Sequence, residues 1–288
     1  MALHVQSSTP VRTSEAHEEG VHSVAVFSDG ERMVSASYHE TLRMHDLKTG
    51  VVLKKMEGHR ESVWGLAVSR DGKLIASGDQ RGEIIAWHGG TSESITQVIK
   101  AHSRVVTSLD FSPDGTVLAT GSLDETTKLW NTQTWQMHGN PIHCCSTVRC
   151  IRYSPSGEIL AIATYRNIQI YDAGTVHCIA NLAGRTSYVY NFSLAWTLDS
   201  TRLLSGASRI PAYESGIHQL GSAMFAIAIH PAGALVASAS GDNNVRLWRL
   251  SDRQTIAIFQ SSNDAMCVTF SKDGKHIISG GRDNKISE

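Results

Sequence analysis

Residues 101–130 read AHSRVVTSLDFSPDGTVLATGSLDETTKLW, and this stretch contains the pattern that decides the fold. Three short runs of β-branched and apolar residues, 105–111, 117–122 and 126–130, are separated by the turns Ser112-Pro113-Asp114-Gly115 and Leu123-Asp124-Glu125. Runs of this length between Pro, Asp and Gly turns are typical of strands joined by hairpins. The stretch therefore predicts three neighbouring antiparallel strands.

The same pattern recurs along the whole chain. A small sheet of this kind cannot bury both of its faces alone, so several copies must stack on one another. Successive turns are 42, 43, 42, 43, 33 and 41 residues apart, a period typical of sheets arranged in a ring. The turns predict seven such sheets in a single domain over residues 1–288, and they begin at Phe27, Ser69, Ser112, Ser154, Thr197, His230 and Ser271.

The repeat resembles the WD40 repeat of β-propellers. That family's repeat has a His before the first strand, a Ser or Thr on the second, an Asp in the next turn and a closing Trp. The corresponding residues here are His102, Thr120, Asp124 and Trp130. The resemblance implies that these side chains form a hydrogen-bonded tetrad, which would supply the partners that a partly buried carboxylate requires. It covers essentially the whole chain and implies an all-β, seven-bladed WD40 β-propeller.

Closure of the ring is a separate question. In the family, the N-terminal segment supplies the outermost strand of the last blade, and residues 9–15 are placed for this role, whereas residues 1–8 are expected to be flexible. The register places the Trp of the last repeat one position after Glu288. Loss of a large buried aromatic costs about 3–5 kcal/mol. We therefore expect a propeller closed by its own N-terminal strand, with weakened closure.

The fifth repeat is predicted to be degraded. Its turn is followed by the next one after 33 residues, whereas the other intervals are 41 to 43. The third strand would have to come from residues 210–215, where Pro211 removes a hydrogen-bond donor from the ladder. We expect an irregular loop or a weak edge in this region.

The tetrad is uneven along the chain. Only the third repeat carries all four residue types at the expected positions. The second has Arg81 at the Asp position, and the fourth ends in Tyr171 without the polar partners. The first has His39 and His45 in place of Asp and Trp. Most blades are therefore expected to depend on apolar packing more than on the tetrad.

Composition restricts the function classes. A formal charge of −1 gives no global reason to expect a nucleic acid or an anionic membrane as partner. No apolar run approaches the roughly 20 residues of a membrane span, and MALHVQSSTPVRTS has no apolar signal core. These features predict a cytoplasmic or nuclear protein. Five cysteines without regular spacing predict reduced thiols.

Neither metal nor catalytic chemistry is predicted. Two groups contain metal-ligand residue types but lack ligand spacing: His17 with His39 and His45, and His143-Cys144-Cys145 with Cys150. No G-x-S-x-G, Walker loop, G-x-G-x-x-G or H-E-x-x-H sequence occurs. The repeat accounts for Asp124 and Asp242 as tetrad members. We predict no cofactor, no metal and no enzymatic activity.

The resemblance also implies a binding face. Partners of this family commonly dock around the central channel, through the residue five after the His position and the residue just before the Asp position. The first set is His22, Trp64, Thr107, Arg149, Phe192, Phe225 and Met266, and the second is Tyr38, Gln80, Leu123, Tyr165, Ser208, Gly241 and Arg282.

Eight of these positions carry residue types that are enriched at interface hot spots. They form the predicted partner-binding face: Tyr38, Trp64, Arg149, Tyr165, Phe192, Phe225, Met266 and Arg282. The alternative for Phe192 and Met266 is that they simply belong to the core.

The predicted function is that of a monomeric, non-enzymatic scaffold. It would bind a partner protein or peptide within a multiprotein complex, on the face around the channel. Two alternatives remain: a degenerate, poorly closing WD40 product, which cooperative unfolding would exclude, and an enzymatic propeller, which would require His and acidic residues to converge on the channel.

Overall fold

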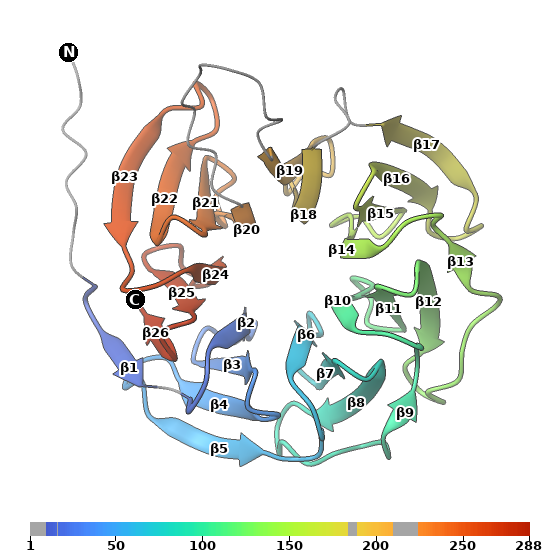
Figure 1. Ribbon diagram of the computed structural model, residues 1–288, viewed down its shortest axis with the longest axis horizontal. Helices are drawn as coiled ribbons and strands as arrows, with labels where there is room; N and C mark the ends of the chain where they lie inside the picture. The colour runs from blue at the N-terminus through green and yellow to red at the C-terminus, as the bar shows by residue number, and fades with distance from the viewer. Residues whose placement is uncertain (1–9, 16, 184–188, 210–223) are drawn as a thin grey trace.

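The computed structural model describes residues 10–15, 17–183, 189–209 and 224–288. All regular structure in these ranges is β, and it forms small antiparallel sheets arranged around a central opening (Figure 1). Six sheets have four strands each, and one has two. We call the four-stranded sheets blades 1–4, 6 and 7 after their repeats, and the two-stranded one sheet 5.

Each blade except blade 7 is a meander in which every strand pairs with the next one along the chain. Blade 1 comprises β2 (Val21–Val26), β3 (Arg32–Ser37), β4 (Leu42–Asp46) and β5 (Val52–Met56). Blade 2 comprises β6 (Val63–Val68), β7 (Leu74–Asp79), β8 (Glu83–His88) and β9 (Ile99–Lys100). Blade 3 comprises β10 (Val106–Phe111), β11 (Val117–Ser122), β12 (Thr126–Asn131) and β13 (Ile142–His143).

The second half of the ring follows the same plan except at sheet 5. Blade 4 comprises β14 (Val148–Tyr153), β15 (Ile159–Thr164), β16 (Asn167–Asp172) and β17 (Cys178–Ala183), and sheet 5 comprises β18 (Val189–Trp196) and β19 (Leu203–Arg209). Blade 6 comprises β20 (Met224–Ile229), β21 (Leu235–Ser240), β22 (Asn244–Arg249) and β23 (Thr255–Gln260). Blade 7 comprises β24 (Ala265–Phe270), β25 (Ile277–Gly281), β26 (Lys285–Ser287) and, from the start of the chain, β1 (Thr13–Glu15).

The second strand of a blade is buried on both faces because blades pack against it from either side. β11 is buried over Leu118–Ser122, and its small residues let the next blade approach closely. A Cβ atom built on Gly121 would lie 2.5 Å from Val148 Cγ1 of blade 4. This spacing explains the runs of Ala, Ser, Thr and Gly at this place in the repeats.

The turns between the first two strands share one geometry. In six of the seven, a glycine such as Gly115 has a positive φ (73°), a conformation that glycine adopts without strain. The turn after β18 has Ser200 at this place, with φ 60°. In the five turns that carry an Asp, its side chain accepts a backbone hydrogen bond from two residues on, as from Thr116 N to Asp114 Oδ1 at 3.1 Å. Repeated turn chemistry thus sets the register of each blade.

The prediction of seven blades is wrong in its count, because the described residues form six complete blades. The repeat at sheet 5 is the short one, and its two described strands pair from Val189↔Arg209 to Trp196↔Leu203. The chain between sheet 5 and β20 lacks the length of the other repeats and contains Pro211. The predicted irregular loop or weak edge at 210–215 lies outside the described residues.

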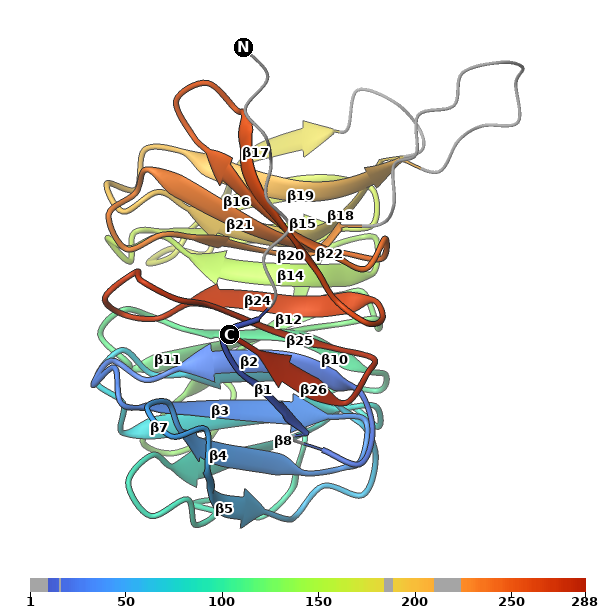
Figure 2. The same cartoon turned by 90° about the vertical axis from the view of Figure 1, so that its left-hand side faces the viewer.

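Blade 7 is built from both ends of the chain. β1 pairs with β26 in the register Thr13↔Ser287 to Glu15↔Lys285, and the two strands lie side by side in both views (Figures 1 and 2). The pairing continues beyond the strands, because Glu288 N donates to Arg12 O at 2.9 Å. The predicted closing strand over 9–15 is thus present over a shorter span, and residues 1–8 lie outside the described ranges.

Arg12 ties this closure to blade 1. Its guanidinium donates to Leu47 O at 3.0 Å and to Lys48 O at 2.8 Å, and it lies 3.7 Å from the carboxylate of Glu288. Arg12→Ala is therefore expected to lower the free energy of unfolding by about 1–2 kcal/mol. Urea unfolding checks this, with Lys73→Ala, whose ion pair with Asp71 is exposed, as the matched control. Equal effects would show that Arg12 does not hold the ring closed.

Candidate functional site

The tetrad residues of blade 3 lie together. His102 Nε2 is 2.9 Å from Thr120 Oγ1, which also accepts the Trp130 indole N–H at 2.9 Å. His102 Nδ1 lies 3.0 Å from Asp124 Oδ2. Burial alone would raise the pKa of Asp124, but hydrogen bonds from His102 and Thr126 outweigh it and hold that pKa well below its usual value. The four side chains therefore connect the inner strands to the outer ones.

Blade 2 has an equally complete network, and the prediction that only blade 3 is complete is wrong. His59 Nε2 lies 2.7 Å from Ser77 Oγ, which accepts the Trp87 indole N–H at 2.8 Å. The carboxylate comes from Asp79, whose Oδ2 lies 2.9 Å from His59 Nδ1. Asp79 stands two residues before the expected position, where Arg81 points instead to Glu61. The repeat pattern did not predict Asp79, because this carboxylate reaches the imidazole nitrogen from the end of β7 and the pattern expects it in the turn that follows.

Blade 1 replaces the indole with a second imidazole. His17 Nε2 lies 2.6 Å from Ser35 Oγ, and His45 Nε2 lies 2.8 Å from the same oxygen. Burial, followed by the Arg43 charge, lowers the pKa of His17 to about 3 and that of His45 to about 4. Both rings are thus neutral at pH 7, and a shared hydroxyl holds them. His39, the other histidine of this repeat, lies 3.2 Å from a Glu18 carboxylate oxygen.

Blades 4 and 6 keep parts of the network. Tyr171 closes blade 4 in place of the Trp, and Ile162 stands where blade 3 has Thr120, so the Tyr171 hydroxyl donates instead to Gln169 Oε1 at 2.9 Å. In blade 6 the Trp248 indole N–H donates to Ser238 Oγ at 2.8 Å. Asp242 forms an ion pair with Arg246 rather than with an imidazole. The aromatic residue at the end of the third strand therefore donates a hydrogen bond within its blade even where the tetrad is incomplete.

The channel contains a cavity of about 270 Å³. Its walls come from the innermost strands of blades 1–4, 6 and 7 and of sheet 5, together with the turns beside them. Members of both predicted sets line it: His22, Tyr38, Trp64, Thr107, Arg149, Phe225, Met266 and Arg282. Figure 1 shows these innermost strands around the opening. The cavity therefore collects residues from repeats that are distant in sequence.

Six of the eight residues of the predicted partner-binding face line this cavity. Tyr165 lies outside the lining and is 40% exposed. Phe192 belongs to β18, but its side chain lies outside the described part of the chain. Met266 is 9% exposed, so it belongs to the core and to the cavity wall at once.

An aromatic cluster forms one side of the cavity. The His22 and Trp64 rings lie 4.5 Å apart between centroids, and Tyr38 packs edge-on at 5.5 Å from His22 and 5.6 Å from Trp64. Burial lowers the pKa of His22 to about 4, so the ring is neutral at pH 7. These contacts hold three large side chains in fixed positions, which suits them to act as a rigid contact surface.

Two buried polar atoms of this cluster have no partner among the described residues. They are Nδ1 of His22 and Nε1 of Trp64. Leaving a buried donor unpaired costs about 1–3 kcal/mol.

The charged groups of the cavity wall are arginines. Arg149, Arg152 and Arg282 line it, and no carboxylate does so among the described residues. Arg282 lies 3.4 Å from the Asp264 carboxylate, at the rim. Arg152 was missed by sequence reasoning. The sequence does contain a signal for Arg152. Arg152 and Asp110 occupy the same inner-strand position of consecutive repeats and carry opposite charges, which indicates that they lie close together.

The described residues hold no group of three His, Cys, Asp or Glu arranged for a metal ion. All five cysteines are free, and of the four candidate ligands near β13 and β14, Cys144 and Cys150 are buried. The described ranges also contain no helix that is long and apolar enough to span a membrane.

Small four-stranded sheets in a ring, held by imidazole, hydroxyl, carboxylate and indole groups, define a β-propeller with WD-type repeats. The family description "WD domain, G-beta repeat" matches residues 8–46, 50–88, 93–131, 217–249 and 253–287, which together make up more than half of the chain. The chain belongs to the WD40 family. The unmatched part contains sheet 5 and blade 4, in which Tyr171 replaces the closing Trp.

Several proteins of known name are similar to this chain. Periodic tryptophan protein 2 of Arabidopsis thaliana is 26% identical over 250 residues, covering 85% of this chain and 24% of that protein. A guanine nucleotide-binding protein subunit beta of Zea mays is 33% identical over 134 residues, covering 43% of this chain and 35% of that protein. Autophagy-related protein 16 of Arabidopsis thaliana is 22% identical over 302 residues, covering 97% and 57%. The chain thus spans less than two thirds of each relative.

Proposed function

We propose that this chain is a non-enzymatic platform that binds a partner protein or peptide at the mouth of its channel. The observation that carries the proposal is the cavity that joins six residues of the predicted face. Aromatic and arginine side chains in fixed positions are the usual centres of protein interfaces. The similarity to a subunit of a guanine nucleotide-binding protein also supports a role within a complex.

The charge of the cavity points to the chemistry of the partner. Arg149, Arg152 and Arg282 favour a carboxylate, while Trp64 and Phe225 favour an apolar side chain next to it. The partner segment is therefore an acidic one that also carries apolar side chains.

The platform proposal includes three further predictions from the sequence. Residues 1–288 act as one domain, the protein is monomeric, and its location is cytoplasmic or nuclear. The absence of enzymatic activity belongs to the proposal as well. It is supported by the relatives, none of whose names is that of an enzyme.

A triple substitution tests the platform. Trp64→Ala, Phe225→Ala and Arg149→Ala together are expected to weaken binding of selected peptides by at least about 100-fold, because hot-spot truncations cost about 2 kcal/mol or more each. Peptides would be selected on the immobilised chain from a random display library, and affinities would be measured by calorimetry. Acidic residues beside apolar ones are expected among the selected sequences.

The matched control changes three exposed residues of outer strands. Leu53→Ala, Ile179→Ala and Leu182→Ala remove side chains that are 52%, 59% and 53% exposed, far from the channel. This control should bind like the original chain, and both triple variants should keep the sheet signal in circular dichroism. Unchanged binding by the channel variant would move the site to another face.

A further inference from the structure

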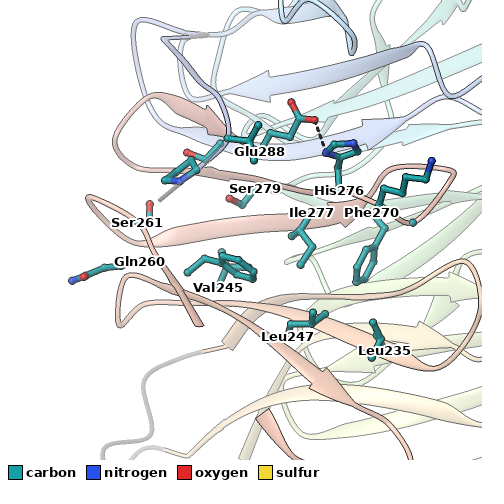
Figure 3. Close-up of a pocket in the computed structure, with 16 residues that line it drawn as sticks. Leu235, Val245, Leu247, Gln260, Ser261, Phe270, His276, Ile277, Ser279 and Glu288 are labelled. Carbon is teal, nitrogen blue, oxygen red and sulfur yellow. Dashed lines mark ion pairs between the residues drawn. The ribbon is translucent and has the colours of Figure 1, made fainter. Parts of the chain in front are cut away.

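Charged residues line two cavities of this chain, and their pairing differs between the two. A cavity of about 280 Å³ between blades 6 and 7 has mainly apolar walls (Figure 3). Its charged residues are in ion pairs, Glu288 with His276 at 2.9 Å and Lys275 with Asp273 at 3.8 Å. Arg152, by contrast, lines the channel cavity without forming a close ion pair in the described part of the chain. The channel is therefore the place where a charged ligand group would find a partner.

Arg152 and Asp110 stand at a position of the inner strand that is otherwise small. Each is the last residue but one of its strand, β14 and β10. The residues at this position in the other five sheets are Ala25, Ala67, Ala195, Ala228 and Thr269. The repeat itself thus requires no charge here. Two opposite charges in neighbouring blades call for a separate explanation.

Arg152 is fixed at the channel wall by both of these blades. Its Nη1 donates to Ile151 O at 2.7 Å and lies 3.5 Å from Ser108 Oγ. Ser108 Oγ also accepts the Ile151 N–H at 3.1 Å. Within the described ranges the side-chain hydrogen bonds of Arg152 come from Nη1, which leaves Nε and Nη2 for a group in the cavity. A guanidinium fork of this kind binds a carboxylate through two parallel hydrogen bonds.

Asp110 lies on the adjacent strand, behind the lining of the cavity. Its Oδ2 accepts the Tyr153 N–H at 2.8 Å. Burial raises the pKa of Asp110 to about 6, although the Arg152 charge and the N–H groups of Tyr153 and Phe111 act against burial. Asp110 is therefore mostly ionised at pH 7, but a modest change in its surroundings is enough to protonate it.

The other groups around Asp110 do not replace it in this role. The strands packed against β10 are β6, β7, β11 and β14. β6 and β11 carry no titratable side chain, and Asp79 of β7 pairs with His59. Besides Arg152, β14 carries Arg149, Cys150 and Tyr153. Burial, followed by the Asp110 charge, raises the pKa of Tyr153, so its hydroxyl stays neutral. Asp110 is thus the one carboxyl group of β10 and β14.

A carboxylate that binds Arg152 also comes close to Asp110. Two carboxylates beside one guanidinium repel each other, and the repulsion favours protonation of one of them. We propose that Asp110 selects the group that binds at Arg152: this subsite takes one carboxylate of the acidic partner segment, and Asp110 takes up a proton as that carboxylate binds. The inference rests on the platform proposed above. A neutral amide lacks the charge that Arg152 requires, and a phosphate dianion carries one charge too many.

Capped amino acids test the subsite without knowledge of the partner. N-acetyl-L-glutamate N-methylamide is expected to bind the 288-residue chain with a Kd on the order of 1–10 mM at pH 6. It should shift the NMR signals of the Arg152 Nε–H and the Asp110 carboxyl carbon. The affinity should fall about 5-fold from pH 6 to pH 7.5, because fewer protons are available to Asp110. The glutamine analogue, the control probe, should shift neither signal, and both probes should leave Ile277 in the other cavity unchanged.

Three variants separate the roles of the two residues. Asp110→Asn keeps an oxygen for the Tyr153 N–H, and it is expected to bind the glutamate probe about 5- to 10-fold more tightly at pH 7.5, without pH dependence. Arg152→Gln should weaken binding at least about 10-fold. Asp252→Asn, the matched control, changes an exposed carboxylate that pairs with Arg249. This control should keep both the affinity and the pH dependence of the original chain.

The outcomes distinguish this subsite from the platform. No shift at Arg152, or a pH dependence that persists in Asp110→Asn, would overturn the proposal. Tighter binding of N-acetyl-O-phospho-L-serine N-methylamide than of the glutamate probe at pH 7.5 would also overturn it. None of these results alters the peptide binding that the triple substitution of Trp64, Phe225 and Arg149 tests. Normal peptide binding by that triple variant would refute the platform at the mouth, whereas the probe titration would still decide the carboxylate subsite.

Discussion

Asp79→Ala is expected to lower the free energy of unfolding by about 3 kcal/mol. The carboxylate is fully buried, pairs with His59 at 2.9 Å, and accepts the backbone N–H groups of Arg81 and Glu83, both at 2.9 Å. Removing it leaves one imidazole and two buried or half-buried donors without their acceptor, and each unpaired group costs about 1–3 kcal/mol. Equilibrium urea unfolding, followed by tryptophan fluorescence, measures the change.

The control for this prediction is Arg81→Ala, at the place where the repeat pattern expects the carboxylate. The Arg81 side chain is 50% exposed and pairs with Glu61 at 2.9 Å, a surface ion pair worth less than about 1 kcal/mol. A near-neutral Arg81→Ala beside a severe Asp79→Ala would establish that Asp79 completes the blade 2 tetrad. Similar effects of the two substitutions would contradict this reading.

Acidification from pH 7 to pH 5 is expected to destabilise the chain through three buried histidines of blade 1. Burial lowers the pKa of His17 to about 3 and the pKa values of His22 and His45 to about 4, whereas an unfolded histidine has a pKa of about 6.5. Below pH 6.5 the unfolded chain therefore binds more protons. The stabilisation is present above pH 6.5 and is lost as the pH falls toward 4. Each histidine contributes about 1–2 kcal/mol to the loss at pH 5.

His45→Trp isolates part of this effect. The substitution restores an indole that can donate to Ser35 Oγ, as in blades 2, 3 and 6, and it removes one of the three titrating rings. Asp110 acts in the opposite direction, because burial raises its pKa to about 6, so its protonation favours the folded chain as the pH falls. Urea unfolding at pH 7 and pH 5 should show a smaller loss for His45→Trp. An unchanged loss would place the acid sensitivity outside this tetrad.

The ring of sheets could be predicted from the sequence because turns such as Ser112-Pro113-Asp114-Gly115 repeat with a period of one blade. Turn chemistry is local, so its consequences can be read along the chain. The short interval after Thr197 predicted a degraded fifth repeat, but it did not show that sheet 5 would have two strands within the described residues. Pairing depends on neighbouring blades, which a local pattern does not describe.

The candidate site was predictable where a side chain's place follows from the repeat. Trp64 and Phe225 line the channel because each inner strand presents the same position to it, and Arg282 lines it from the turn after β25, the second position that repeats. Asp79 and Arg152 could not be found this way. Asp79 reaches its imidazole from a shifted position, and Arg152 turns toward the channel beside Ser108 of the preceding blade. Both depend on three-dimensional proximity rather than on register.

The pairing of β1 with β26 also determines how the ring responds to mechanical force. Thr13 faces Ser287 and Glu15 faces Lys285, so Arg12 and Glu288 lie at the same end of the ladder. A pull applied to these two residues loads the hydrogen bonds one after another, like a zipper, and never all together. The closure that completes the ring is therefore also a place where tension between the two ends of the chain breaks one hydrogen bond at a time.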